Sequence, residues 1–235
     1  MDQFAVSWGL DAGVVRGLCV GAACGFSLNR IAKAVGPDDI VMRYPRWVWL
    51  TGSFVQFVVY PLLYYLAWSG KDFSLGWLQG TWTDYLQPGG GGMDYEYMLI
   101  YALFGYMVKD VASMKSDRLF LVHHIVSIVL ALVILYLPAG VGLSLSGLVI
   151  LEVGTAFYGL KCQYPQSKVF LWLYLVMMTL SNLVVEVLIV WFYFLAPPSA
   201  YFKVLYAVFG TGLIYGRQAE VAKDFWFARR QSKAE

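Results

Sequence analysis

Two adjacent histidines, His123 and His124, lie inside an apolar stretch of the chain and are its only histidines. The stretch reads DRLFLVHHIVSIVLAL over residues 117–132. Imidazole exchanges protons near neutral pH, so a histidine beside a carboxylate can act as a general base, and it can also accept an acyl group as a nucleophile. The pair therefore predicts proton-transfer or acyl-transfer chemistry inside an apolar environment.

Two carboxylates in neighbouring apolar segments are the candidate partners of this pair. At 1.5 Å per helical residue, the histidines lie roughly 8–9 Å inside the charged end of their segment, and Glu152 lies about 12 Å from the same side. Asp110 ends the preceding apolar segment on that side as well. We therefore expect a catalytic group made of His123, His124, Asp110 and Glu152. The expected substrate-binding residues are Tyr106, Ser127, Thr155 and Arg217.

The two histidines are expected to have different roles, because adjacent helix positions point about 100° apart. One ring would face the reacting centre, and the other would steady it or bind a carboxylate. Asn182 and Glu186 are expected deeper in the membrane, where they would extend a polar path.

Two other interpretations of the histidines stay open. Two imidazoles and one carboxylate could bind a single metal ion, but no diagnostic ligand spacing occurs, and we expect no metal. A buried pair held by hydrogen bonds, with no chemistry, is about as well supported by the residues alone.

Composition identifies the environment of these residues. Of 235 residues, 60% are apolar and 14% are charged, and the mean hydropathy is +0.62. Soluble domains are usually about 45–50% apolar and about 25% charged, so this composition indicates an integral membrane protein. The net charge of +2 gives no indication of nucleic-acid binding.

Apolar stretches of about 20 residues are long enough to cross a bilayer, and the chain contains seven of them. We therefore predict an all-α polytopic protein with seven transmembrane helices. The predicted segments are residues 12–35, 47–69, 94–114, 118–137, 139–160, 169–195 and 201–227. Pro138 predicts a tight hairpin between the fourth and fifth segments.

The basic residues predict the orientation. Of the 17 Lys and Arg, Arg16 and Arg217 lie within predicted segments, thirteen fall on one side, and only Lys71 and Lys203 fall on the other. Basic residues accumulate in cytosolic loops, so the N-terminus is expected to be lumenal and the C-terminus cytosolic.

Five glycines recur at every fourth residue of the first segment and form a small-residue ridge on one helix face. Such a ridge allows another helix to approach closely, and the partner can be the protein's own bundle or a second protein. Because this segment also contains Arg16, Asn29 and Arg30, we expect it at the periphery of the bundle. The ridge consists of Gly9, Gly13, Gly17, Gly21 and Gly25.

Four motifs occur in an order that resembles the TLC-domain family, which includes ceramide synthases, translocating-chain-associating proteins and small lipid-homeostasis proteins. They are FGYMVKD, RLFLVHHIVSIVL, LVILEVGTAFYGLK and IYGRQAEVAKDFW. The resemblance covers residues 43–230 and leaves the first predicted helix outside. It implies an N-terminal helix and loop at 1–42, a TLC-like membrane domain at 43–230 and a short cytosolic tail at 231–235.

The resemblance implies six helices around a cytosol-facing cavity that contains the histidine pair, in the membrane of the endoplasmic reticulum. Ceramide synthases use such a site to transfer an acyl group from acyl-CoA to a sphingoid amine. They also contain H-D-x-x-D in the fifth span, where this chain reads LEVGTAF. This chain is therefore more similar to the small TLC proteins.

The leading hypothesis is a TLC-type membrane protein that handles a long-chain lipid, with N-acyl transfer as its reaction. Acyl-CoA would be its co-substrate, and no bound cofactor is expected. One alternative is a non-catalytic lipid-binding, lipid-homeostasis or cargo-escort protein. Another is a helical scaffold subunit of a membrane assembly.

The distribution of basic residues generates a topological prediction. A protease or epitope probe should reach the tail FARRQSKAE from the cytosol and residues 89–92 from the opposite side of the membrane. Detection of both segments on one side would contradict the seven-helix arrangement.

Overall fold

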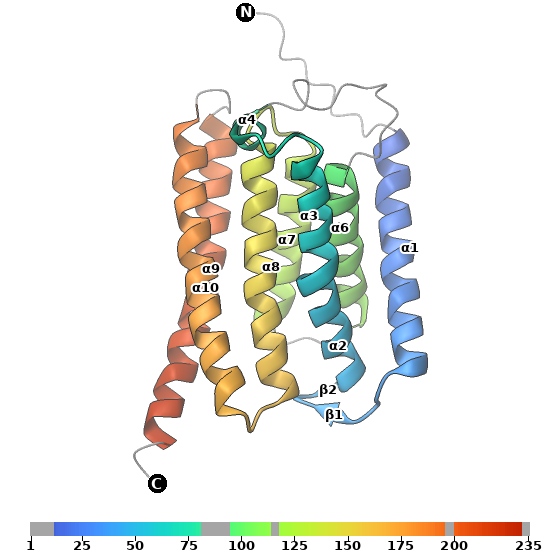
Figure 1. Ribbon diagram of the computed structural model, residues 1–235, viewed down its shortest axis with the longest axis vertical. Helices are drawn as coiled ribbons and strands as arrows, with labels where there is room; N and C mark the ends of the chain where they lie inside the picture. The colour runs from blue at the N-terminus through green and yellow to red at the C-terminus, as the bar shows by residue number, and fades with distance from the viewer. Residues whose placement is uncertain (1–11, 81–94, 114–117, 196–199, 232–235) are drawn as a thin grey trace, which may run out of the picture.

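Long helices run side by side through the computed structural model, which describes residues 12–80, 95–113, 118–195 and 200–231 (Figure 1). Helix α1 (Ala12–Val35) forms one edge. Helices α9 (Lys168–Phe194) and α10 (Ala200–Gln231) form the other, and α8 (Val141–Gln163) lies between the two edges.

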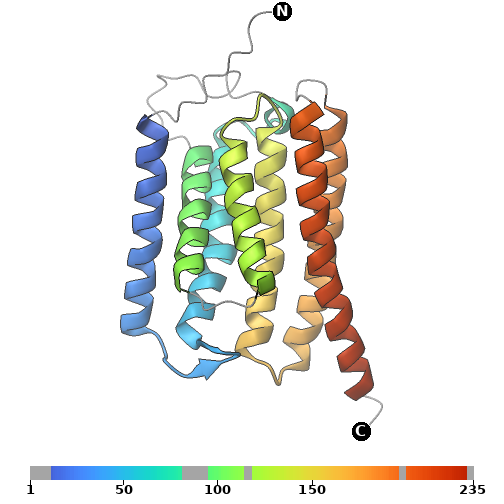
Figure 2. The same cartoon turned by 180° about the vertical axis from the view of Figure 1, so that it is seen from behind.

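Three further long segments complete the bundle. The first is a continuous helical rod formed by α2 (Arg46–Phe54), a π-helical turn η1 (Val55–Val59) and α3 (Tyr60–Ser69). The others are α6 (Tyr95–Ser113) and α7 (Arg118–Ile134), and α7 and α10 face the viewer in Figure 2. The remaining elements are the short helix α4 (Leu75–Gln79) and the antiparallel pair β1 (Ile40–Val41) and β2 (Tyr44–Pro45).

Helices occupy all seven predicted segments, and four of them are long and apolar enough to cross a membrane. These four are α1, the rod Arg46–Ser69, α8 and α9. Helix α7 has 17 residues, and α6 and α10 contain ionisable residues such as Lys109, Asp110 and Arg217, which lower their hydropathy. The structure therefore shows an almost entirely helical protein with the character of an integral membrane protein.

Helix α8 lies deep in the bundle, and all of its residues from Val141 to Val149 are buried. The connection from α7 at residues 135–140 contains Pro138, as expected. It ends at Gly140, which has φ of 76°. A β-carbon at Gly140 would approach the Phe192 ring of α9 to 2.7 Å. Positive φ and close packing together favour glycine at this position.

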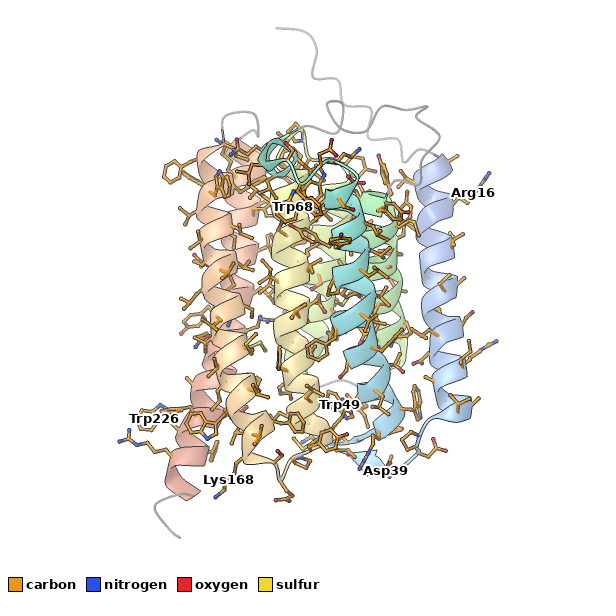
Figure 3. The ribbon with its side chains drawn as sticks, viewed as in Figure 1. Arg16, Asp39, Trp49, Trp68, Lys168 and Trp226 are labelled. Carbon is orange, nitrogen blue, oxygen red and sulfur yellow. The ribbon has the colours of Figure 1, made fainter. Side chains whose placement is uncertain are left out.

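Tryptophans lie near both ends of the bundle, where the interfaces of a bilayer would be. Trp68 lies at one end, and Trp49 and Trp226 lie at the other (Figure 3). Indole rings prefer the boundary between headgroups and hydrocarbon, so the side chains at the two ends suit a bilayer around the middle of the bundle.

The glycine ridge of α1 packs against the protein's own helix α6, and α1 is peripheral, as expected. A β-carbon at Gly25 would lie 2.6 Å from the Gly105 carbonyl oxygen, and one at Gly21 would overlap the carbonyl of Tyr101. Gly17 approaches the Tyr101 ring. Intramolecular docking thus accounts for Gly17, Gly21 and Gly25, whereas Gly9 lies outside the described residues.

Substitution of Gly105 by alanine should weaken the contact between α1 and α6, because the new methyl group would overlap the backbone of Gly21. Overpacking of this kind typically costs about 1–3 kcal/mol. The matched control is Gly212→Ala on α10, where a β-carbon has nothing within 4 Å. Thermal melting of the purified variants should show a lower melting temperature for Gly105→Ala only. Equal melting temperatures would contradict the close packing.

Candidate functional site

His124 belongs to a buried charged group formed by α6 and α7. Its Nε2 lies 3.3 Å from Oδ2 of Asp110, and the other carboxylate oxygen of Asp110 forms an ion pair with Nζ of Lys109. The ammonium of Lys109 also lies 4.2 Å from the centroid of the Tyr106 ring. The side chains of Lys109, Asp110 and His124 are all nearly inaccessible. Mutual pairing offsets the large desolvation cost of burying these groups.

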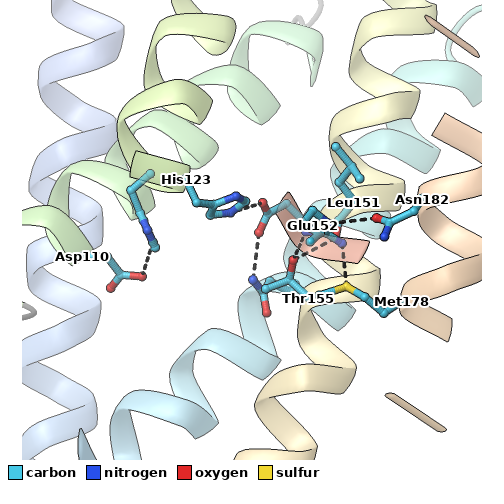
Figure 4. Close-up of polar contacts among 10 residues, drawn as sticks. Asp110, His123, Leu151, Glu152, Thr155, Met178 and Asn182 are labelled. Atoms are coloured by element: carbon cyan, nitrogen blue, oxygen red, sulfur yellow. Dashed lines mark hydrogen bonds and ion pairs between the residues drawn. The ribbon is translucent and has the colours of Figure 1, made fainter. Parts of the chain in front are cut away.

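His123 points to the second carboxylate, Glu152 of α8, with Nε2 3.8 Å from Oε1 (Figure 4). The other carboxylate oxygen, Oε2, accepts a hydrogen bond of 2.8 Å from the amide of Gln56 in η1. The His123 side chain is 14% exposed, whereas that of Glu152 is 2% exposed. Of the two imidazoles, His123 is therefore the more accessible to a ligand.

The two rings differ in direction, as the helix geometry predicts. Their centroids lie 5.4 Å apart and their planes are nearly perpendicular, at 88°. Each ring faces its own carboxylate, so the structure brings His123, His124, Asp110 and Glu152 together as two coupled pairs. The His124–Asp110 pair lies within hydrogen-bond distance, whereas the His123 and Glu152 atoms lie 3.8 Å apart, beyond that range.

A third polar group surrounds Arg217 of α10, and its partners Thr155 and Asn182 lie close to Glu152 in Figure 4. Its Nε donates to Oδ1 of Asn182 at 2.9 Å, and its Nη1 donates to Oγ1 of Thr155 at 2.6 Å. Its Nη2 contacts the carbonyl oxygen of Leu151 and the sulfur of Met178, both at 2.9 Å. The guanidinium thus ties α8, α9 and α10 together.

The predicted substrate-binding residues all lie in or near this polar layer, although their roles stay predictions. Tyr106 and Ser127 are buried on α6 and α7. Thr155 and Arg217 bond to each other. The sequence predicted that Asn182 lies deeper. In the structure Asn182 accepts a hydrogen bond from Arg217, so it lies in the same polar layer. Glu186 accepts a hydrogen bond from Thr211 of α10 instead.

Sequence reasoning missed two residues that hold the carboxylates. Lys109 was counted among the cytosolic basic residues, but its side chain is buried against Asp110. Gln56 was not considered, although a glutamine within an apolar stretch is itself a signal of a polar partner. The sequence neighbours Lys109 and Asp110 could have indicated a local ion pair, whereas the contact from Gln56 to Glu152 joins distant segments.

An apolar pocket adjoins the polar layer at Leu151, the residue before Glu152. Four helices, α7 to α10, contribute to its walls, and it extends along α8 from Leu151 to Ser144. Phe192 and Tyr206, whose ring centroids lie 4.7 Å apart, line it at the far end from the polar layer. The four candidate catalytic residues do not line this pocket, and the cavity expected around them stays a prediction.

Among the described residues, no group of three or more His, Cys, Asp and Glu side chains is arranged to hold a metal ion. No family model, curated protein or solved structure matches the chain. The features that bear on function are therefore the three polar groups and the pocket beside them.

Substitution of Arg217 by lysine should lower the free energy of unfolding by about 2–4 kcal/mol, because one ammonium cannot replace the bonds of three guanidinium nitrogens. Arg16→Lys is the matched control, since Arg16 is exposed and projects outward from α1. Denaturation of both variants in detergent measures the difference. A stability of Arg217→Lys equal to that of the control would show that the guanidinium network is dispensable for folding.

Proposed function

We propose that the protein is a TLC-type membrane enzyme that acts on a long-chain lipid through proton transfer at the His123–Glu152 and His124–Asp110 pairs. The proposed reaction is N-acyl transfer from acyl-CoA to a lipid amine. The observation that carries this proposal is the pairing of each buried imidazole with its own carboxylate. Ionisable groups are costly in an apolar bundle, so two such pairs favour a chemical role.

The two imidazoles differ in accessibility, so we assign different roles to the two pairs. His123 is the more exposed, so it serves as the base that takes a proton from the attacking amine while the nitrogen bonds to the thioester carbonyl carbon. Glu152 stabilises the resulting imidazolium. As the carbon–sulfur bond breaks, the proton is returned to the thiolate of CoA. His124 is held by Asp110, which also binds Lys109, and it orients the His123–Glu152 pair.

The apolar pocket beside the polar layer supports an apolar ligand group, although its volume of about 40 Å³ is far below that of a long hydrocarbon chain. Its lining is almost entirely aliphatic and aromatic, and it begins beside the polar layer at Leu151. We propose that the pocket receives only a short part of the hydrocarbon chain, with the polar end of the lipid near Glu152 and Arg217. Apolar pockets with a few polar groups at one end commonly bind ligands of this kind.

A seven-helix arrangement with a cytosolic C-terminus and a location in the endoplasmic reticulum is part of the proposal. Helices at all seven apolar segments support the seven crossings. Lys168 lies at the same end of the bundle as Trp226, which suits a cytosolic basic end (Figure 3). The resemblance of the four motifs to TLC proteins supports the location and the substrate class.

Non-catalytic lipid binding is the second candidate, and one observation favours it. Both oxygens of Asp110 and both oxygens of Glu152 already lie next to partners within the protein. A fully paired polar layer can hold the helices together without chemistry. In that case the pocket would bind lipid and the histidines would be structural.

Mass spectrometry of the reaction mixture and of the purified protein separates the two candidates. Incubation with palmitoyl-CoA and a long-chain amine should consume the thioester and produce an amide. An acyl-histidine adduct that hydroxylamine removes would show that an imidazole is itself acylated. Bound but unchanged lipid would support the binding protein.

Alanine at His123 should reduce turnover by about 10²–10⁴-fold, because general-base assistance is lost. Alanine at His124 should lower both turnover and melting temperature, since it leaves Asp110 and Lys109 without their third partner. Lipidomics and thermal melting of both single variants check this difference. Unchanged lipids with a lowered melting temperature in both variants would make the histidines structural.

A further inference from the structure

The hydroxyl group of Tyr60 is fully buried and has no hydrogen-bond partner among the described residues. Tyr60 begins α3, and its ring packs edge-to-face on that of Tyr106, with centroids 6.3 Å apart. The Tyr106 ring in turn lies 4.2 Å from the ammonium of Lys109, which binds Asp110, so the Tyr60 ring packs onto the polar layer. A buried hydroxyl normally finds a partner, because leaving it unpaired costs about 1–3 kcal/mol.

A π-helical turn, Val55–Val59, directly precedes Tyr60. The N–H of Tyr60 donates to the carbonyl of Val55 rather than to that of Gln56. Pro61 follows and has no N–H to offer the preceding turn. Gln56, within the same turn, reaches Glu152. Single π-helical turns frequently occur at functional sites.

The groups around Tyr60 indicate what kind of partner its hydroxyl can bind. Asp110 is engaged by Lys109 and His124, and Glu152 is engaged by Gln56 and His123. The Tyr60 hydroxyl bonds to neither carboxylate in the structure, so what it lacks is an acceptor for its proton. An amine would bring further donors, whereas a carbonyl oxygen brings the missing acceptor.

We propose that the Tyr60 hydroxyl donates a hydrogen bond to the carbonyl oxygen of the acyl group. This inference rests on the proposed acyl transfer and adds a residue to it. When the amine nitrogen bonds to the carbonyl carbon, the electron pair of the C=O bond moves to that oxygen, and it returns as the carbon–sulfur bond breaks. The neutral Tyr60 hydroxyl stabilises the charge on the oxygen without giving up its proton.

A pair of ligands that differ in one oxygen tests the contact. Palmitoyl-CoA contains the thioester carbonyl, and S-hexadecyl-CoA is a thioether that lacks it. The full-length wild-type protein should bind palmitoyl-CoA about 3- to 10-fold more tightly, as expected for one hydrogen bond. Tyr60→Phe should abolish this preference and leave the affinity for the thioether unchanged. Its turnover should fall about 10²–10³-fold.

Two controls separate the contact from effects on folding. Tyr60→Phe retains the ring and removes no hydrogen bond of the described residues, so its melting temperature should stay at the wild-type value. Tyr174→Phe, in a separate buried cluster of α8 to α10, should retain the wild-type preference for palmitoyl-CoA.

The outcomes distinguish this inference from the proposed function. Equal wild-type affinity for the two ligands, or a preference that survives in Tyr60→Phe, would overturn the role of Tyr60 and leave acyl-CoA binding intact. The second result would indicate that the hydroxyl binds only a buried water. Failure of the wild type to bind either ligand would overturn the acyl-CoA proposal and this inference with it.

Discussion

The cost of burying charge in an apolar bundle governs the interior of this protein. Asp110, Glu152, Lys109 and Arg217 all lie at or near zero exposure, and an isolated charge there would destabilise the fold severely. Each is instead matched by a neighbour from another helix or from the adjacent residue. The pairs are also the contacts that join α6 to α7, η1 to α8, and α10 to both α8 and α9, so the polar layer fixes how the helices sit against one another.

Much of the helical architecture was predictable because it follows from local properties of the chain. The lengths of the apolar stretches predicted the helices, and Pro138 predicted the hairpin. The glycine spacing of α1 indicated a close contact with another helix. The adjacency of His123 and His124, with the depths of Asp110 and Glu152, predicted that these four would meet. Their meeting depends only on helix geometry and on distance from one end of the bundle.

The remaining features of the candidate site depend on contacts between helices that no local sequence pattern predicts. The sequence does not show that Gln56 faces Glu152, or that Asn182 bonds to Arg217 rather than lying deeper. Positive-inside counting assigns Lys109 to one side of the membrane and does not show that its side chain is buried against Asp110. Pro61 marks an irregularity in its helix, but the π-helical turn before Tyr60 is seen only in the structure.

In the proposed seven-helix arrangement, the tight connection between α7 and α8 also bears on how the chain would enter the membrane during synthesis. A short hairpin lets two neighbouring helices partition into lipid as one unit. His123 on α7 and Glu152 on α8 lie 3.8 Å apart in the finished bundle. Insertion of a lone central charge costs about 2.5–3.5 kcal/mol, so a hairpin that carries both partners begins to neutralise that cost before the later helices arrive. The same side chains that form the site thus assist the biogenesis of the helices that carry them.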